Sequence, residues 1–353
     1  MTRKVMVGAV PVGGGERVKI QSMTTEKTSD TEKTAAQILR LEEAGCDIVR
    51  GAILDEADAR GVRAVKEKIH IPFVADIHFS AKLAVMSIEN GADKVRINPG
   101  NIGGEADIRR VADAVKARHI PVRVGANTGS IEADFLRRYG RSAEALVESA
   151  LYNVGILERY GVNDIVISVK ASSVPLTVEA YRLLARRTDH PLHVGVTEAG
   201  TTEMGLVKSS VGIGALLLDG IGDTIRVSLT DDPVKEVYAA RNILRACGLD
   251  GDYVELVSCP TCGRCRWDSM ALAEKVAAYV KDVRVPAKVA VMGCVVNGPG
   301  EVQDADLGIA GGEGSCMLFK KGKPFLRVSA AEAEEKFFEQ LRLLLEEKRR
   351  GRA

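Results

Sequence analysis

Aromatic residues are scarce in this sequence, and neither sign of charge predominates. Phe, Trp and Tyr make up only 4% of the 353 residues, which argues against the stacking platforms that bind single-stranded nucleic acid. Lys and Arg number 49 and Asp and Glu 48, so the formal net charge is +1. We therefore expect no nucleic-acid partner, although a local basic pocket is compatible with this balance.

Long hydrophobic runs are also missing. No apolar run approaches the ~20 residues of a membrane helix, and the start at Met1–Val5 lacks the apolar region of a secretory signal. We expect a cytoplasmic protein that has no role at a membrane. In a reducing compartment the seven cysteines indicate metal binding or chemistry rather than disulfides. Five of them fall in the last third of the chain: Cys259, Cys262, Cys265, Cys294 and Cys316.

Short β-branched runs alternate with amphipathic helical stretches from Val18 to about Gly248. The expected strands are Val18–Met23, Ile48–Gly51, Phe73–Ile77, Lys94–Asn98, Val122–Gly125, Asp164–Lys170, Leu192–Thr197 and Thr224–Leu229. The expected helices include Asp30–Ala44, Asp55–Ile69, Ile108–Arg118, Ser142–Tyr160, Val178–Arg187 and Val234–Ala246. Eight such repeats predict an α/β fold, a (β/α)8 TIM barrel over residues 1–250. A doubly wound open sheet is the rival, but no Gly-x-Gly-x-x-Gly turn follows the first strand.

The pattern changes near Gly251, where the strand–helix alternation becomes irregular. The expected elements there are strands Val254–Ser258, Lys288–Met292, Ser315–Phe319 and Pro324–Val328, and helices Ser269–Val280 and Ala331–Lys348. This arrangement predicts a smaller α+β domain over residues 251–353.

Basic side chains recur at or near the carboxyl ends of the predicted barrel strands, where active sites of this fold lie. They are Arg50, Arg96, Arg123, Lys170 and Arg226, and polar groups accompany them at Asp76, His78, Asn98, Asn127 and Ser228. A single arginine there is most simply explained by an ion pair. Several cations converging on one mouth need an anion, and guanidinium groups bind phosphate oxygens in pairs. The sequence therefore predicts a small anionic substrate, and a diphosphate fits this set of cations best.

Glu198 is the clearest carboxylate among these cations. A carboxylate at a strand end can donate or accept a proton, although it can also simply pair with Arg226 or Lys170. Asp76 and His78 alternate along one strand and so share a face. Two such residues are too few to indicate a metal site, and we expect them to form hydrogen bonds with the substrate.

The strongest local signal is the segment SCPTCGRC at 258–265, which is followed by CVVNGPGE at 294–301. A Cys-x-x-Cys turn directs two thiolates to one metal, and Cys294 supplies a third. The spacing alone allows three interpretations. Structural zinc would take Cys259, Cys262, Cys265 and Cys294. An iron–sulfur cluster would take three cysteines and a fourth ligand, and a thioredoxin-like redox pair would use Cys259 and Cys262.

Six motifs occur together in family order: RINPGN at 96–101, RVGANTGS at 123–130, SVKAS at 168–172, VTEAG at 196–200, CPTCGR at 259–264 and CVVNGPGE at 294–301. Through them the chain resembles the bacterial 4-hydroxy-3-methylbut-2-en-1-yl diphosphate synthase family of the methylerythritol phosphate route to isoprenoids. The resemblance implies a TIM barrel followed by a domain similar to sulfite and nitrite reductase modules. It also implies a [4Fe–4S] cluster held by Cys259, Cys262, Cys294 and Glu301. Cys265 departs from the family pattern, which requires no cysteine there.

The resemblance further implies the reaction. The substrate would be 2-C-methyl-D-erythritol 2,4-cyclodiphosphate, and two electrons delivered through the cluster would open the ring and remove an oxygen as water. Glu198 is then the expected proton donor. Glu301 is a second expected catalytic residue, since a carboxylate is a more exchangeable iron ligand than a thiolate. The expected partners are flavodoxin or ferredoxin and a second subunit in a head-to-tail homodimer. A hypothesis of another class is a zinc-stabilised barrel that binds an anionic metabolite without redox chemistry.

Overall fold

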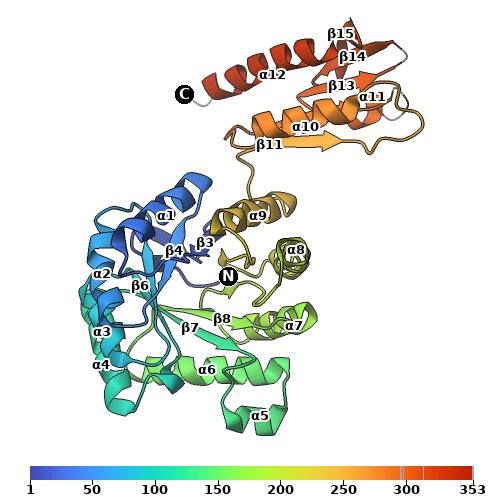
Figure 1. The fold of residues 1–353 in the computed structure, drawn as a ribbon. Coiled ribbons are helices and arrows are strands. Elements are labelled where there is room, and N and C mark those ends of the chain that lie inside the picture. Colours follow the sequence, from blue (N-terminus) through green and yellow to red (C-terminus); the bar gives the residue numbers. More distant parts are fainter. Residues whose placement is uncertain (295, 297, 313, 352–353) are drawn as a thin grey trace. The chain divides into compact units, whose positions relative to one another are not determined.

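The computed structural model describes residues 1–294, 296, 298–312 and 314–351 (Figure 1). The chain divides into two compact units, Met1–Leu249 and Asp250–Ala353. Each unit has a sheet and a hydrophobic core of its own, so each is described by itself.

The first unit is a barrel of eight parallel strands. These are β3 (Lys19–Met23), β4 (Ile48–Ala52), β5 (Phe73–Asp76), β6 (Lys94–Ile97), β7 (Val122–Asn127), β8 (Ile165–Lys170), β9 (His193–Val194) and β10 (Thr224–Ile225). They pair in the order β8-β7-β6-β5-β4-β3-β10-β9. A parallel bridge between Ile167 and Leu192 joins β8 to the start of β9, which closes the ring. The predicted barrel is confirmed.

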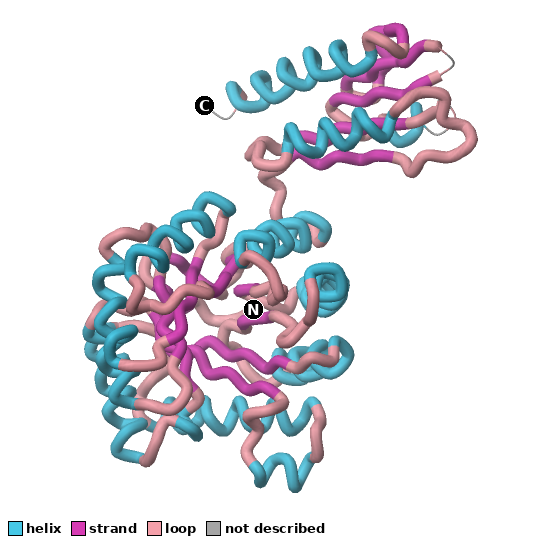
Figure 2. The backbone as a smooth tube through the Cα atoms, in the orientation of Figure 1, coloured by secondary structure: helices cyan, strands magenta, loops and turns pink. Residues whose placement is uncertain are grey.

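Helices surround this ring of strands (Figure 2). They are α1 (Thr31–Ala44), α2 (Glu56–Lys66), α3 (Ala81–Glu89), α4 (Glu105–Arg118), α5 (Ala133–Tyr139), α6 (Ala143–Arg159), α7 (Val174–Ala185), α8 (Thr202–Leu218) and α9 (Pro233–Ala246), with a 3-10 turn η1 (Pro99–Asn101). Local capping defines several helix starts: Asp30, Asp55 and Ser142 each accept a hydrogen bond from a backbone N–H of the first turn.

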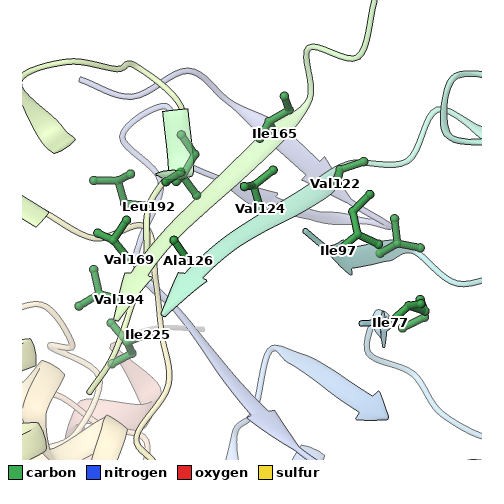
Figure 3. Close-up of a cluster of buried hydrophobic side chains, with 14 of the residues drawn as sticks. Ile77, Ile97, Val122, Val124, Ala126, Ile165, Val169, Leu192, Val194 and Ile225 are labelled. Carbon is green, nitrogen blue, oxygen red and sulfur yellow. The ribbon is translucent and has the colours of Figure 1, made fainter. Parts of the chain in front are cut away.

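The core of the barrel unit lies between the strands and these helices. Figure 3 shows Val122, Val124 and Ala126 of β7 beside Ile165 and Val169 of β8. All five are fully or almost fully buried. Because side chains alternate along a strand, the residues between them, such as Arg123 and Ser168, face the barrel interior. The apolar face thus builds the core, and the other face can carry polar groups.

Two predicted strands are much shorter in the structure. The runs Leu192–Thr197 and Thr224–Leu229 form ladders only over His193–Val194 and Thr224–Ile225. Beyond the ladder the backbones come very close, and a Cβ on Gly195 would lie 2.5 Å from the carbonyl oxygen of Arg226. The chain there is extended but irregular, and it carries site residues past the end of the sheet.

An unpredicted hairpin, β1 (Val5–Val7) with β2 (Val10–Val12), belongs to the barrel unit. Val7 and Val12 are fully buried and form a small cluster with Ile48 and Val74. Ile48 opens β4 and Val74 lies early in β5, so the hairpin covers the amino end of the barrel. This leaves the carboxyl ends of the strands for a site.

The second unit is a five-stranded sheet in sequential order: β11 (Val254–Ser258), β12 (Ala287–Met292), β13 (Leu307–Gly311), β14 (Ser315–Lys320) and β15 (Lys323–Ser329). Strands β11, β12 and β13 are parallel to one another, β14 is antiparallel to β13, and β15 is antiparallel to β14. Helices α10 (Ser269–Val280) and α12 (Ala333–Arg350) share one apolar cluster with the sheet, and the short α11 (Gly298–Glu301) lies by the opposite face. The predicted α+β character is confirmed, and β13 is an additional strand.

Candidate active site

The inward-facing residues at the carboxyl ends of the barrel strands surround a cavity of about 250 Å³. It is lined by Met23, Arg50, Asp76, His78, Arg96, Arg123, Asn127, Ser168, Lys170, Thr197, Arg226 and Ser228. The structure thus brings together every residue predicted to bind substrate except Asn98. Strand alternation could have identified Ser168, because it lies two residues before Lys170 on the same strand. Thr197 could have been identified because it ends the predicted strand Leu192–Thr197.

Asn98 lies outside the lining of this cavity, in the loop after β6. Its side chain is buried, and Oδ1 accepts a hydrogen bond from the Gly100 N–H at 3.3 Å, which caps the 3-10 turn η1. The same N–H donates to Asn153 Oδ1 at 2.7 Å. Asn98 therefore shapes the loop after β6, and it is not among the cavity-lining residues.

Asp76 is the carboxylate at the centre of the cationic residues. Its oxygens lie 3.5 Å from Arg50 Nε and 3.2 Å from Arg96 Nη1. Burial by itself raises the pKa of Asp76, but Arg50, Arg96 and Arg123 together lower it to about 2. Asp76 is therefore ionised at neutral pH and holds two guanidinium groups of neighbouring strands in place.

Two residues outside the predicted set organise the other side of the cavity. The Met23 sulfur accepts from Arg50 Nη2 at 2.8 Å and lies 3.7 Å from Arg226 Nη1. Glu236 of α9 lies 3.5 Å from Arg226 Nε and also accepts from Ser22 Oγ at 3.1 Å. Sequence pattern could not reveal Glu236, because it reaches the barrel from a helix.

Cations outnumber carboxylates in this part of the barrel. Among the described side chains that line the cavity or pair with its lining, five are Lys or Arg and only Asp76 and Glu236 are acidic. Arg123 is 2% exposed, and its Nε and Nη1 atoms have no hydrogen-bond partner among the described residues. Burial and the neighbouring Arg123 and Arg50 hold the pKa of Lys170 well below its usual range. Buried cations of this kind are costly without counter-charge, so the cavity is suited to an anion.

Glu198 follows the cavity-lining Thr197 and is exposed. Its backbone has φ of 50°, a left-handed conformation that is uncommon for a residue other than glycine. It is not among the side chains that line the cavity. The structure places this carboxyl group on the surface just beyond the carboxyl end of β9.

A second cavity, of about 400 Å³, lies in the second unit. Its lining includes Cys259, Cys262, Cys294 and Glu301. These four residues come from the turn after β11, the loop after β12 and the end of α11. Residues 295 and 297 of the CVVNGPGE motif lie outside the described residues.

Cys265 is not part of the lining of this second cavity. Its sulfur lies 3.0 Å from the Trp267 carbonyl oxygen and 3.4 Å from Ser269 Oγ. Cys265 nevertheless lies near the other thiols, because a Cβ at Gly293 would lie 2.9 Å from its sulfur and 3.3 Å from that of Cys259. The zinc interpretation is therefore not decided by the position of Cys265.

The backbone around the thiols is closely fitted. The Gly293 N–H donates to Cys259 Sγ at 3.1 Å, and a Cβ at Gly293 would lie 2.9 Å from Cys265 Sγ. Within the described part of the chain, no three His, Cys, Asp or Glu side chains are grouped closely enough to hold a single metal ion. Three thiols and one carboxyl around a cavity of this volume fit a larger group with several metal atoms. Thiolates are the ligands that such iron–sulfur groups take.

Fold and site together define a TIM-barrel protein with a cationic cavity at the carboxyl ends of its strands, followed by a domain with a cysteine- and glutamate-lined cavity. The description "GcpE TIM-barrel domain" matches residues 2–241, and "GcpE protein C-terminal domain" matches residues 255–343. The chain belongs to the GcpE family.

Curated relatives agree over nearly the full length. A protein of Caldanaerobacter subterraneus subsp. tengcongensis is 53% identical over 348 residues, which cover 98% of this chain and 98% of the relative. One of Desulfotalea psychrophila is 52% identical over 350 residues, with 98% and 96% covered. Both are named 4-hydroxy-3-methylbut-2-en-1-yl diphosphate synthase (flavodoxin). The predicted family resemblance is confirmed.

Solved structures are similar to the chain at the level of the fold alone. Dihydropteroate synthase of Yersinia pestis has 12% identity and a TM-score of 0.50, and the match covers 70% of this chain and all of that one. A truncated 3-deoxy-D-arabino-heptulosonate 7-phosphate synthase of Thermotoga maritima has 14% identity and a TM-score of 0.50, with 70% and 94% covered.

None of the described helices has the length and apolar character that would let it cross a membrane.

Proposed function

We propose that this chain is an oxidoreductase of isoprenoid biosynthesis that converts 2-C-methyl-D-erythritol 2,4-cyclodiphosphate to 4-hydroxy-3-methylbut-2-en-1-yl diphosphate. The reaction consumes two electrons and a proton and releases an oxygen of the substrate as water. One observation supports it most directly: the chain has two cavities, one lined by cationic residues suited to bind the anionic substrate and one lined by thiols suited to hold an electron-carrying group. The relatives that match at about half identity carry the name of this activity.

The group that the second cavity would hold is a [4Fe–4S] cluster, with Cys259, Cys262, Cys294 and Glu301 as its ligands. When bound, such a cluster supplies electrons one at a time to the substrate. The types of ligand support this assignment. Three thiolates are soft ligands, and the harder carboxylate of Glu301 would be the ligand that exchanges most readily. Gly293 contributes an N–H that stabilises negative charge on the Cys259 sulfur.

The barrel residues bind and orient the diphosphate. Asp76 pairs with Arg50 and Arg96, and Glu236 pairs with Arg226. These ion pairs orient the three guanidinium groups before the substrate binds. Arg123 and Lys170 form no such ion pair with a described carboxylate, and a bound anion would supply the negative charge that favours their protonated forms. Ring opening leaves additional charge on the diphosphate, and these cations stabilise it. Asn127, Ser228 and His78 complete the polar lining as hydrogen-bonding groups.

Glu198 is our proposed proton donor for the departing oxygen. Its carboxyl group is exposed on the face of the barrel where the cavity opens, next to the lining residue Thr197. An exposed carboxyl exchanges protons freely with water, as a repeatedly used donor must.

The proposal extends to partners and location. The relatives' name indicates flavodoxin as electron donor, and ferredoxin is the other expected donor. We propose a cytoplasmic, head-to-tail homodimer in which the cluster-binding half of each active site comes from the second subunit. Nucleic acid and membranes play no part in this function.

Cysteine variants test the cofactor assignment. Protein purified without oxygen should contain about four irons and four sulfides per chain. Cys294→Ser should lose most of both and all turnover, because a thiolate ligand is removed. Cys265→Ser is the matched control and should keep the iron, since its sulfur is not part of the cavity lining. The measurements are iron and acid-labile sulfide content and reduction of the substrate.

Two results would contradict the proposal. Stoichiometric zinc without sulfide in the wild type would leave an anion-binding barrel that has no redox chemistry. Loss of iron in Cys265→Ser, with retention in Cys294→Ser, would show that the ligand set is wrong.

A further inference from the structure

A layer of polar side chains lies beneath the cationic cavity inside the barrel. Gln21 of β3 and Lys94 of β6 each precede a cavity-lining residue, Met23 and Arg96, by two positions. His193 of β9 precedes the lining residue Thr197 by four. Since side chains alternate along a strand, all three face the same interior as the cavity, nearer the amino ends of the strands.

These side chains are buried, and several of their polar atoms lack partners. Gln21 is 1% exposed, and Lys94 and His193 are 0% exposed. Within the described part of the chain, Lys94 Nζ, His193 Nε2 and both amide atoms of Gln21 have no hydrogen-bond partner. Polar atoms this deeply buried are normally satisfied by internal water. In this layer no described hydrogen-bond partner fixes the protonation state of the Lys94 amine.

Lys94 is surrounded by positive charge. The charged and titratable groups that face the interior from the packed elements are Lys19 of β3, Arg50 of β4, Asp76 of β5, His78 after β5, Arg96 of β6, Arg123 of β7, Lys170 of β8, His193 of β9, Arg226 after β10 and Glu236 of α9. The two carboxylates, Asp76 and Glu236, pair with arginines rather than with Lys94. Burial, followed by the nearby Arg123 and Arg50, lowers the pKa of Lys94 to about 7.

We propose that Lys94 takes up a proton from solution when a doubly charged cyclic diphosphate binds in the cavity above it. This inference rests on the proposed function for its substrate. The amine and one solvent proton form an ammonium group, and no bond of the substrate changes. Lys94 is not among the cavity-lining residues, so it is a positioning residue that acts through its charge on Arg123 and the bound anion.

The sign of the pH dependence follows from this coupling. An anion nearby favours the charged amine, so the pKa of Lys94 is higher in the complex than in the free protein. Below pH 7 the free amine is already protonated, and binding takes up little. Above pH 7 binding should take up close to one proton at Lys94, and affinity should fall by about tenfold per pH unit until the pKa of the complex is reached.

Calorimetric titration of the full chain with its cluster tests this. The cyclic diphosphate is added without reductant at pH 8, in two buffers of different ionisation enthalpy, and the proton uptake is derived from the difference in heat. Wild type should take up roughly one proton more than Lys94→Met. Affinity of Lys94→Met should also depend less on pH between 7 and 9. Lys19→Met is the matched control and should behave as wild type. Lys19 interacts with Asp47 and Glu16 at the start of β3, whereas the charges that act on Lys94 are those of Arg123 and Arg50.

Equal proton uptake by wild type and Lys94→Met would overturn the inference while leaving the proposed function intact. Failure of the wild type to bind the cyclic diphosphate would instead refute the proposed function and this inference with it. Thermal unfolding verifies that Lys94→Met folds; we expect its unfolding temperature to be equal or higher, because a buried amine without a partner is removed. If it does not fold, Lys94→Gln gives the same comparison.

Discussion

Glu198 combines an exposed carboxyl group with a left-handed backbone in the segment after β9. Such backbone strain persists only where the surrounding structure enforces it, and it is often found at functional sites. Next to it Ala199 is buried and Thr197 lines the cavity, so the neighbours hold this conformation on both sides. At the scale of the residue, Glu198 thus combines a strained backbone with an exposed carboxyl group beside the cavity lining.

Glu198→Gln should therefore keep the backbone and lose the proton. We expect turnover to fall by about 10²-fold or more, since general acid catalysis contributes at least that much. Substrate affinity and iron content should remain as in wild type, measured by titration and metal analysis. Glu203→Gln, an exposed glutamate in the first turn of α8, is the control. Near-normal turnover in Glu198→Gln would remove Glu198 from the mechanism.

At the scale of the element, the two ends of the barrel have different tasks. The β1–β2 hairpin closes the amino end through Val7 and Val12, which pack on Ile48 and Val74. The cationic cavity lies at the carboxyl ends. Interior positions between the two ends carry the polar layer of Gln21, Lys94 and His193. The hairpin therefore contributes to stability and separates this layer from solvent at the amino end.

Val7→Ala should destabilise the barrel by about 2 kcal/mol, because buried methyl groups are lost and a void remains. The measurement is chemical denaturation followed by circular dichroism. Met6→Ala in the same strand is the control, since Met6 is half exposed and its truncation should cost little. Substrate affinity should be unchanged in both variants. A larger loss of affinity than of stability in Val7→Ala would show that the hairpin shapes the site.

At the scale of the whole molecule, the two groups of site residues belong to different compact units. Every lining residue of the cationic cavity lies within Met1–Leu249, and every lining residue of the cysteine cavity lies within Asp250–Ala353. Each half can therefore be inactivated by mutation without touching the other.

A complementation experiment tests the proposed head-to-tail dimer. Cys294→Ser and Arg96→Ala should each be inactive alone. Mixed after dissociation and reassociation, they should regain about a quarter of wild-type activity, because half of the dimers are mixed and each has one intact site. Activity is measured as substrate reduction, and differently tagged chains verify the heterodimers. Verified heterodimers without activity would place both halves of the site in one chain.

The sequence by itself determined the repeating strand–helix order and the faces of the strands. Periodicity two is a local property of the chain, so the amino-acid pattern alone placed Arg50, Arg96, Arg123 and Lys170 at one mouth. The cysteine motifs were equally local, and their resemblance to a family predicted a ligand set. The residues so selected do line two cavities in the structure, except Asn98 and Glu198.

Only the tertiary structure decided which side chains meet. The pairing of Asp76 with Arg50 and Arg96, and the approach of Glu236 from α9 to Arg226, join residues far apart in the chain. Such contacts depend on strand register and helix packing, which no local pattern encodes. The same holds for the position of Cys265, which lies near Cys259 but outside the lining of the cysteine cavity, and for the burial of Lys94 without a hydrogen-bond partner among the described residues. A side chain's charge and hydrogen bonds depend on its neighbours in space, and the closed barrel determines those neighbours.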